Sequence, residues 1–395
     1  MLNILLTHNF YQQSGGEDSV FEQEYDLLRQ RGHKVVRLTR DNRSVESMGR
    51  LPLIRSTFWN SEVAREVKEI IHSEKIDLVH SHNTFPLISP SIYTAAKEAG
   101  VPIVQTIHNY RLVCAAATLT RNGQPCDDCS TSNSMIPAVF HRCYRSSTAA
   151  TLVLTGMLRA HRVAGTWTSK VTRYIALTQF MKTKLVAGGL PAEKITVKPN
   201  FYPDRLSPRK TLGRFALFVG RLSPEKGPGI LLDAWSKDVR LPLTIVGSGP
   251  EHDSISKRAL NMPDVRVVGP QSSQQVFDLM RDAYCLIVPS LWYEGFPMVI
   301  IEAFAAGLPV LVSGHGSLAE IVEDGSTGLH FRPGDSDDLA AKVGRLVSSP
   351  LDAQRMGHAA RAEFESKYTA DSNYRMLEEI YGEALRSHAG SLSFH

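Results

Sequence analysis

The sequence predicts an α/β protein with two Rossmann-like, doubly wound domains that face a central cleft. Along the first hundred residues, short apolar and β-branched runs alternate with amphipathic stretches, a rhythm typical of parallel strands joined by helical crossovers. The same rhythm begins again near residue 215. A length of 395 residues, with 43% apolar and 21% charged residues, suffices for two buried sheets.

In the first domain, strands are expected at 3–6, 35–38, 78–80, 103–107, 174–177 and 195–197, and helices at 17–31, 62–72, 91–97 and 180–186. The first helix carries its apolar residues at helical spacing and stops at Gly32, a residue that favours helix ends. Residues 111–170 interrupt the rhythm with a cysteine cluster and a basic stretch rich in Ser, Thr and Ala. An insertion of this length in a compact domain is usually functional or mobile.

In the second domain, strands are expected at 215–219, 243–246, 265–268, 285–288, 310–312 and 329–331. Pro199, Pro203 and Pro208 indicate an interdomain linker before it. Residues 371–385 place their apolar side chains on one face, which predicts a long amphipathic helix that docks on other elements. We therefore assign residues 1–203 and 371–395 to an N-terminal domain, and 204–370 to a second domain.

Charge and hydropathy indicate where the protein works. Its apolar stretches fall short of the roughly 20 residues that span a bilayer, and no basic segment precedes the first apolar run, so we expect a cytoplasmic protein. Nothing acidic occurs between Asp128 and Glu193. The basic residues of that window are Arg142, Arg145, Arg159, Arg162, Lys170, Arg173, Lys182 and Lys184. Such a field attracts anions.

The basic window also contains a moderately amphipathic helix candidate at 149–159. A basic amphipathic face suits the anionic inner leaflet of a membrane or a lipid-diphosphate acceptor, while an ordinary basic surface helix is the alternative. We expect peripheral contact with an anionic membrane, and no nucleic-acid partner.

The loop after the first strand disfavours an oxidoreductase. A dinucleotide site would require G-x-G-x-x-G there, and residues 8–17 lack that fingerprint. Gly15 and Gly16 instead precede a helix N-terminus, where backbone N–H groups and the helix dipole favour a phosphate or another developing negative charge. A plain turn is the alternative.

A second motif, Gly-Arg-Leu-Ser-Pro-Glu-Lys-Gly at 220–227, follows the first strand of the second domain. Ligands of doubly wound sheets bind at the carboxyl ends of strands, so Arg221 and Lys226 are expected to point into the cleft. A departing nucleoside diphosphate develops negative charge, which fixed cations stabilise without reorganisation. A solvated turn with incidental charges is the alternative.

A third motif places Glu294 before, and Glu302 inside, a predicted helix whose first turn holds Pro297. Carboxylates on each side of a helix start can hydrogen-bond two sets of sugar hydroxyls. Free N–H groups at the helix start face phosphate or hydroxyl oxygens. The stretch expected to bind the donor there is Phe296, Pro297, Met298 and Val299.

With these motifs the chain resembles the family 4 glycosyltransferases, a retaining class with the GT-B fold, over nearly its whole length. The resemblance rests on the Gly-Gly loop, GRLSPEKG, VGSGPE, PSLWYEGFPMVIIEAFAAGLPV and GSLAEIVEDGSTGLHFRPGD. It implies that Arg221 and Lys226 hold the donor pyrophosphate, that Glu302 contacts the ribose hydroxyls and that Glu294 contacts the donor sugar. It also implies that the first domain binds the acceptor and that the final helix crosses back to it, so that domain closure assembles the site.

The expected activity is transfer of a sugar from a nucleotide-diphosphate donor to a lipid-linked or polysaccharide acceptor in surface glycan synthesis. His108 ends a predicted strand of the first domain and can bond the donor sugar or orient the acceptor hydroxyl; a satisfied strand-end histidine is the alternative. His82 and Asn83 end the preceding strand and are weaker candidates. In this class the diphosphate can serve as base, so catalysis rests on positioning and charge stabilisation. The catalytic set is His108, Glu294, Arg221 and Lys226.

Two features concern metals and the donor loop. Relatives often read E-G-F-G where this chain has Pro297 in place of the second glycine, which removes one N–H donor. The chain lacks a D-x-D motif placed to clamp a diphosphate, so no catalytic metal or other catalytic cofactor is expected.

The cysteines at 114, 126, 129 and 143 have a spacing compatible with a structural zinc ion that would fold the insertion. The zinc ligands would be Cys114, Cys126, Cys129 and Cys143, and free thiols or a disulfide are the alternative.

Other functions are compatible with the same architecture. A sugar-nucleotide epimerase would form product from the donor without an acceptor. A phosphorylase of this fold would need a pyridoxal lysine and a longer chain. An inactive donor-binding partner subunit is the third alternative, and it has no chemical reason to retain Arg221, Lys226, Glu294 and Glu302 together.

Overall fold

The computed structural model describes residues 1–13, 15–203, 207–237 and 239–392. The chain divides into two compact units. Unit 1 comprises Met1–Thr118, Asp127–Asn200 and the segment from Asn373 onward, and unit 2 comprises Leu119–Cys126 and Phe201–Ser372. Each unit is built on a six-stranded sheet, which confirms the predicted pair of α/β domains. Positions 204–206 of the predicted linker lie outside the described residues.

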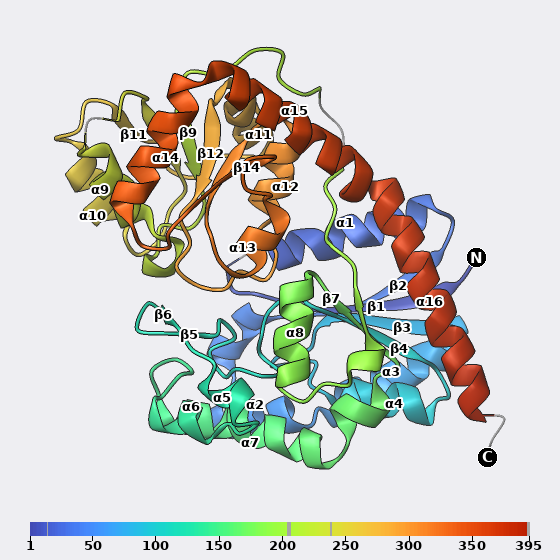
Figure 1. Cartoon of the computed structure of the whole chain (residues 1–395). Coiled ribbons are helices and arrows are strands. Elements are labelled where there is room, and N and C mark those ends of the chain that lie inside the picture. The colour runs from blue at the N-terminus through green and yellow to red at the C-terminus, as the bar shows by residue number, and fades with distance from the viewer. Residues whose placement is uncertain (14, 204–206, 238, 393–395) are drawn as a thin grey trace. The chain divides into compact units, whose positions relative to one another are not determined.

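The sheet of unit 1 is parallel throughout. Its order is β2 (Lys34–Asp41), β1 (Asn3–Phe10), β3 (Leu78–Asn83), β4 (Ile103–Ile107), β7 (Arg173–Ala176) and β8 (Ile195–Val197). Its crossover helices are α1 (Gly16–Gln30), α3 (Ser61–Glu74), α4 (Ser91–Glu98) and α8 (Gln179–Ala187), with a short turn η3 (Ala192–Lys194) before β8. Within this unit, α1 lies on one side of the sheet, and α3 and α4 lie on the other (Figure 1). β1 runs four residues beyond the predicted strand end, because Thr7 to Asn9 are buried although polar.

The last helix, α16 (Ala370–Leu392), packs on the sheet of unit 1. Leu377, Ile380 and Tyr381 are buried there and form one core cluster with Ile4 and Leu28. The apolar stripe that was read from the sequence is therefore the face that the helix buries.

The insertion contains more regular structure than the sequence indicated. It holds β5 (Thr120–Arg121), β6 (Gln124–Pro125), α5 (Asp128–Thr131), α6 (Ile136–Phe140), α7 (Thr148–Val163) and η2 (Thr166–Lys170). The helix expected at 149–159 is the centre of α7, which Ser147 caps by accepting a hydrogen bond from the N–H of Ala150. The sequence analysis also missed η1 (Asn42–Ser47) and α2 (Arg50–Phe58), since α2 buries little of its surface and has no clear apolar stripe.

The sheet of unit 2 is likewise parallel. Its order is β11 (Val265–Val267), β10 (Leu243–Val246), β9 (Ala216–Val219), β12 (Cys285–Val288), β13 (Val310–Ser313) and β14 (Gly328–Phe331). Its helical elements are η4 (Pro224–Lys226), α9 (Pro228–Trp235), α10 (His252–Ala259), α11 (Ser273–Asp282), α12 (Met298–Ala305), α13 (Gly316–Ile321), α14 (Ser336–Ser348) and α15 (Pro350–Lys367). Apolar residues of β9, β10 and β12 form its core with α9 and α14.

One local prediction in unit 2 is corrected. Pro297 was expected inside the first turn of a helix, but it occupies the N-cap position, and α12 begins at Met298. With φ −73° and ψ 110°, Pro297 has the extended backbone typical of a cap. Among the helices that the structure describes, none combines the length and the apolar composition that a membrane span requires.

Candidate active site

In each sheet the strand order reverses at one point, and such points are where open α/β sheets bind ligands. In unit 2, β9 lies between β10 and β12, so the connections leaving β9 and β12 run to opposite sides. In unit 1, the reversal lies between β1 and β3. The side chains at the carboxyl ends of these four strands are therefore the first candidates for a site.

In unit 2, the loops after β9 and β12 bring together two of the predicted residues. The Nζ of Lys226 lies 2.6 Å from Oε1 of Glu294. The same Oε1 accepts a hydrogen bond of 2.6 Å from the hydroxyl of Ser290. The ammonium group also lies 5.1 Å from the centre of the Trp292 ring, within range of a cation–π contact. The predicted cation and the predicted carboxylate therefore form one ion pair at the reversal point.

Backbone contacts hold these two loops against each other. Gly227 has φ +71°, and a Cβ atom at this position would lie 2.3 Å from the carbonyl oxygen of Pro289. Only glycine fits so close to another backbone. The N–H of Leu291 donates to the carbonyl of Glu225 at 2.8 Å. The second glycine of GRLSPEKG is thus required for the approach that pairs Lys226 with Glu294.

The environment of Glu294 keeps it ionised. The residue is 6% exposed, and burial by itself would raise the pKa of its carboxyl. The ammonium of Lys226 and the hydrogen bonds from Lys226 and Ser290 outweigh that effect and hold the pKa below its usual value. His315, which follows β13, supports Ser290 from behind through a contact of 2.9 Å between its Nε2 and the carbonyl oxygen of Ser290. Neither Ser290 nor His315 was predicted from the sequence as a site residue.

Glu302, on α12, faces a separate hollow of unit 2 of about 120 Å³, which is also lined by Tyr202, Val219, Gln271 and Phe277. Burial raises the pKa of Glu302 to about 7. A carboxyl group in such surroundings can either donate or accept hydrogen bonds near neutral pH. The hollow thus offers one adjustable polar group beside apolar and aromatic walls.

The other predicted residues of unit 2 lie around these two carboxylates. Arg221 follows β9 and is exposed to solvent. Phe296 is 8% exposed and packs its ring 5.9 Å from that of Tyr368, so its side chain serves the core. No side chain among the described residues caps α12, so within that part of the chain the first N–H groups of the helix, those of Met298 and Val299, have no capping side chain.

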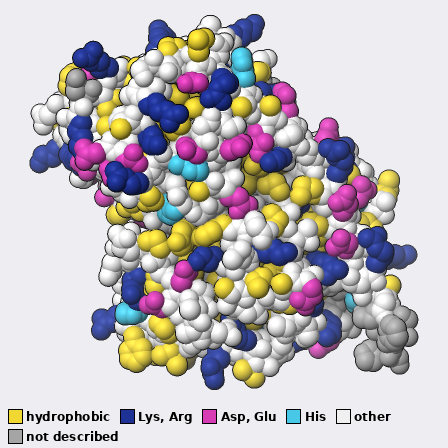
Figure 2. All heavy atoms as spheres, in the orientation of Figure 1, with side chains coloured by type: hydrophobic (Ala, Val, Ile, Leu, Met, Phe, Trp, Pro, Cys, Tyr) yellow, Lys and Arg dark blue, Asp and Glu magenta, His cyan; other side chains and the backbone are white. Residues whose placement is uncertain are grey.

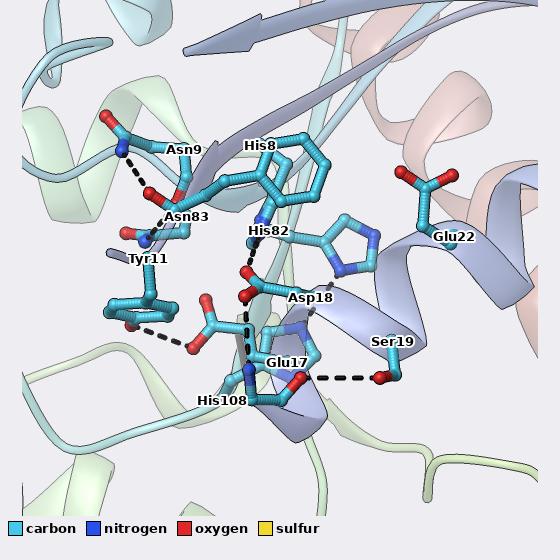
Figure 3. Close-up of polar contacts among 12 residues, drawn as sticks. His8, Asn9, Tyr11, Glu17, Asp18, Ser19, Glu22, His82, Asn83 and His108 are labelled. Atoms are coloured by element: carbon cyan, nitrogen blue, oxygen red, sulfur yellow. Dashed lines mark hydrogen bonds and ion pairs between the residues drawn. The ribbon is translucent and has the colours of Figure 1, made fainter. Parts of the chain in front are cut away.

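In unit 1, the Gly-Gly loop is fixed by a carboxylate from the first turn of α1. Oδ1 of Asp18 lies 2.7 Å from Nε2 of His8 (Figure 3). Oδ2 of Asp18 accepts a hydrogen bond of 3.2 Å from the N–H of Gly15. Gly15 is exposed, and among the residues described around it, its chain neighbours aside, a Cβ atom on it would meet nothing within 4 Å. Gly16 begins the helix. The loop therefore leaves open space at a helix N-terminus, as an anion site requires.

A second carboxyl group, Glu17, lies beside this loop. It accepts a hydrogen bond of 2.9 Å from the hydroxyl of Tyr11, and the amide of Asn109 lies 3.4 Å from it. Burial raises the pKa of Glu17 to about 7. Glu17, His108 and Arg111 line one cavity of unit 1. The sequence analysis did not name Glu17, although its position directly after the two glycines was a usable signal.

His108 follows β4 and is joined to a second histidine. Its Nε2 lies 2.9 Å from Nδ1 of His82, and the two rings are stacked with centres 5.1 Å apart (Figure 3). Burial holds the pKa of His108 well below its usual value, so the ring is neutral near pH 7. Asn83 donates to the carbonyl of Asn9 at 2.8 Å and thus ties the ends of β3 and β1 together.

Comparisons with known proteins identify the family of the chain. The family model "Glycosyltransferase Family 4" matches residues 15–205, and "Glycosyl transferases group 1" matches residues 206–363. A D-inositol 3-phosphate glycosyltransferase of Streptomyces scabiei is 30% identical over 343 residues, which cover 79% of this chain and 69% of that protein. The chain belongs to glycosyltransferase family 4. An uncharacterised glycosyltransferase of Methanocaldococcus jannaschii is 26% identical over 318 residues, 80% of this chain and 78% of that protein.

The fold of this glycosyltransferase is that of solved GT-B enzymes. Anabaena HepE, crystallised with UDP and glucose, superposes with a TM-score of 0.68 at 20% identity and covers 97% of this chain and 100% of its own. Sucrose-phosphate synthase of Thermosynechococcus elongatus gives a TM-score of 0.73 at 17% identity, covering 98% and 100%. At these identities the likeness concerns the fold.

The glycosyltransferase also contains a buried polar group that sequence reasoning missed. Glu24, on α1, is 1% exposed and lies 3.0 Å from His80, 3.2 Å from His82 and 3.4 Å from Lys198. Ligand atoms of Glu24, His80 and His82 lie within 4.8 Å of one another, close enough to hold a metal ion. Lys198 already supplies positive charge there, and both nitrogens of His80 have partners at 2.7 and 2.8 Å. The hydrogen bonds and the ion pair between Glu24 and Lys198 therefore suffice to explain why these polar side chains are buried together, and no metal ion is needed.

Four cysteines cluster in the sequence of the insertion. Cys114 is buried, and Cys126, Cys129 and Cys143 are partly exposed. The zinc site that their spacing suggested stays a prediction, and so do the roles of the individual site residues.

Proposed function

We propose that this glycosyltransferase moves a sugar from a nucleotide-diphosphate donor, bound on unit 2, to a lipid-linked or polysaccharide acceptor, with retention of the anomeric configuration. The observation that carries the proposal is the Lys226–Glu294 pair at the reversal point between β9 and β12. A cation held in place by a buried carboxylate is suited to a leaving diphosphate, because its position is fixed before charge develops.

Different residues of unit 2 bind different parts of the donor in this proposal. Lys226 and Arg221 neutralise the diphosphate, Glu294 bonds hydroxyls of the donor sugar, and Glu302 bonds the ribose hydroxyls in its hollow. The exposed guanidinium of Arg221 becomes ordered when it meets a phosphate, which it can bind through two N–H groups. The free N–H groups of Met298 and Val299 add further donors.

The proposed reaction needs no covalent enzyme intermediate. The bond between the anomeric carbon and the diphosphate oxygen breaks as an acceptor hydroxyl attacks from the same face. The proton of that hydroxyl passes to the departing diphosphate, so the charges balance without a protein base. Holding the acceptor and neutralising the leaving group are then the whole task of the protein.

UDP-sugars are the first donors to test. Anabaena HepE was crystallised with UDP-glucose and shares the fold, which supports that choice.

An acceptor on an anionic membrane is supported by a face of unit 1 built from α2, α6 and α7. Leu51, Ile136, Phe140 and Val163 are between 63% and 81% exposed on these helices. Exposed arginines at 50, 55, 142, 145 and 159 flank these apolar residues in the sequence. Figure 2 shows hydrophobic and basic side chains exposed where α6 and α7 lie in Figure 1. Apolar and basic side chains together favour contact with an anionic leaflet, here the cytoplasmic one.

The test is a transfer assay with labelled UDP-, GDP- and TDP-hexoses and vesicles that carry a polyprenyl-diphosphate-linked sugar. We expect a labelled lipid product whose new linkage has the anomeric configuration of the donor, read by NMR coupling constants. Inverted product would overturn the retaining mechanism. Conversion of the donor without any acceptor would instead indicate the epimerase.

A further inference from the structure

Three side chains from different elements of unit 1 form a chain that ends at His108. Oε1 of Glu24, on α1, lies 3.2 Å from Nε2 of His82, the residue before the last of β3. Nδ1 of His82 lies 2.9 Å from Nε2 of His108, which follows β4. Figure 3 shows the two imidazoles side by side next to the first turn of α1. Each link joins a different pair of atoms, so the proton positions can be deduced in order.

Glu24, at the buried end of the chain, is ionised. It is 1% exposed and lies 3.4 Å from Nζ of Lys198, itself 1% exposed. Burial alone would raise the pKa of Glu24, but the charge of Lys198, together with the contacts from His80 and His82, outweighs it and holds the pKa well below the usual value. An ionised carboxylate can only accept hydrogen bonds. Nε2 of His82 must therefore carry the hydrogen.

His82 then determines the state of His108. Burial lowers the pKa of His82 to about 4, so near neutral pH the ring carries one hydrogen, on Nε2, and its Nδ1 has a lone pair. That lone pair accepts the Nε2–H of His108. His108 is neutral as well, which leaves its Nδ1 without a hydrogen.

Nδ1 of His108 is the open end of this chain. Among the residues that the structure describes, the hydrogen bond of the His108 ring is made by Nε2, to His82, and none is made by Nδ1. His108 lines a cavity of unit 1 together with Glu17, Asn109 and Arg111. A lone pair beside such a cavity accepts hydrogen bonds from a ligand and cannot donate any.

We propose that Glu24 and His82 are positioning residues that fix His108 in its Nε2–H tautomer, so that Nδ1 accepts a hydrogen bond from one hydroxyl of a bound sugar. This inference rests on the proposed function for the identity of the ligand. It makes His108 selective for a free hydroxyl, since an O-methyl group or a missing oxygen offers no hydrogen to accept. A site built to bond a hydroxyl rejects the analogue that lacks it, because its own polar atom is left unpaired.

The first arm of the test needs no ligand. Long-range 1H–15N NMR of the imidazoles distinguishes the two neutral tautomers in full-length protein, with His108→Asn to assign the signal. We expect Nε2–H for His108 in the wild type. The tautomer should persist in His82→Gln, whose amide can donate to Glu24 and accept from His108, and should become mixed in His82→Phe, which keeps a ring without nitrogen. An Nδ1–H wild type, or an unmixed Nε2–H signal in His82→Phe, would overturn the proposal.

The second arm measures transfer with the donor sugar and its monodeoxy and mono-O-methyl analogues. In the wild type, one hydroxyl position should be required. His82→Phe should lower kcat/KM by about tenfold to a hundredfold and weaken the discrimination at that position, while His82→Gln should recover most of both. Equal discrimination in all three proteins would refute a positioning role. A wild type that transfers no sugar would sink the proposed function alone, since the tautomer is measured without substrate.

Discussion

The two units place polar groups at equivalent points of two similar sheets, but they use them differently. In unit 2, Lys226 and Glu294 form a single ion pair, supported by Ser290 and reachable from solvent on the side of the lysine, which is 25% exposed. In unit 1, Glu24, His82 and His108 are linked in series, with Lys198 buried at the far end. One arrangement presents charge, and the other buries its charge and presents a neutral acceptor atom.

This difference corresponds to two recognition tasks. A leaving diphosphate carries negative charge, and a preorganised cation stabilises it. A sugar hydroxyl is neutral, and a buried charge close to it would be costly unless the charge were already paired. In unit 1 the charge of Glu24 is paired with that of Lys198. The ligand therefore meets only a neutral histidine nitrogen whose role as hydrogen-bond acceptor is fixed by His82 and Glu24. The four changes below test this contrast between the units, from the largest expected effect to the smallest.

Replacing Lys226 by Ala should have the largest effect on activity. Removing one preorganised donor to a developing negative charge typically costs about 10²–10³ in kcat. Loss of the lysine also leaves Glu294 buried without its cation, so the variant should be less stable. The double variant Lys226→Ala/Glu294→Gln should recover the melting temperature but not transfer. A Lys226→Ala enzyme with wild-type kcat would show that unit 2 does not present charge to the donor.

Replacing Lys198 by Met should act on stability. Removing one partner of a buried ion pair costs about 3–5 kcal/mol, because the remaining charge is unpaired. The free energy of unfolding, from urea titration, should fall by about that amount at pH 8. The loss should be smaller at pH 5, since a Glu24 carboxyl without Lys198 has a higher pKa and can take up a proton. The double variant Lys198→Met/Glu24→Gln should recover most of the free energy of unfolding that Lys198→Met loses at pH 8. Undiminished stability of Lys198→Met would mean that unit 1 does not depend on this pair.

Replacing Glu302 by Gln should stabilise the ligand-free protein at alkaline pH. The pKa of Glu302 is raised in the folded protein from 4.5 to about 7, so the folded state binds its proton more tightly than the unfolded state. The stability due to this proton is present below pH 4.5 and is lost as the pH rises to 7. Gln carries no charge at any pH, so the variant should gain up to about 3 kcal/mol over the wild type at pH 8, and nothing at pH 4. Donor binding should weaken at the same time. If the melting temperatures of the wild type and of Glu302→Gln depended on pH in the same way, the burial of this carboxyl would be contradicted.

Replacing Arg221 by Ala should have the smallest of the four effects. The side chain is exposed, so the folded protein should keep its melting temperature. The KM for the donor should rise about tenfold, since one charge-assisted hydrogen bond is worth about 1.5–3 kcal/mol and part of this is lost to ordering the side chain. Arg221→Lys should recover part of the affinity. An unchanged KM would remove Arg221 from the donor site.

The contrast between the units also explains what could be predicted from the sequence. The strands of both sheets were placed within a few residues, because buried parallel strands appear as apolar runs. The sequence drew attention to Lys226 and Glu294, which the structure pairs, because each sits in a contiguous motif next to a strand end. Ser290 and His315 were missed, because their contribution depends on which loops the fold brings together.

Unit 1 was harder to interpret for the same reason. Glu24, His82, His108 and Lys198 come from four segments between residues 24 and 198, so no local pattern unites them. One signal was available: Glu24 occupies the apolar face of α1 with Val20, Leu27 and Leu28, where a carboxylate needs a buried partner. The identity of that partner could come only from the folded chain.

Binding of a nucleoside diphosphate tests the central claim most directly. UDP, GDP, ADP, CDP and TDP would be titrated into wild-type protein and into Lys226→Ala/Glu294→Gln, with the melting temperature as the readout. At a concentration one hundred times its Kd, a bound diphosphate adds about 2.7 kcal/mol to stability, so one of the five should raise the wild-type melting temperature by several degrees. The double variant should show little or no shift. If none of the five stabilises the wild type, or if one stabilises both proteins equally, the ion pair between the loops after β9 and β12 is not the diphosphate site.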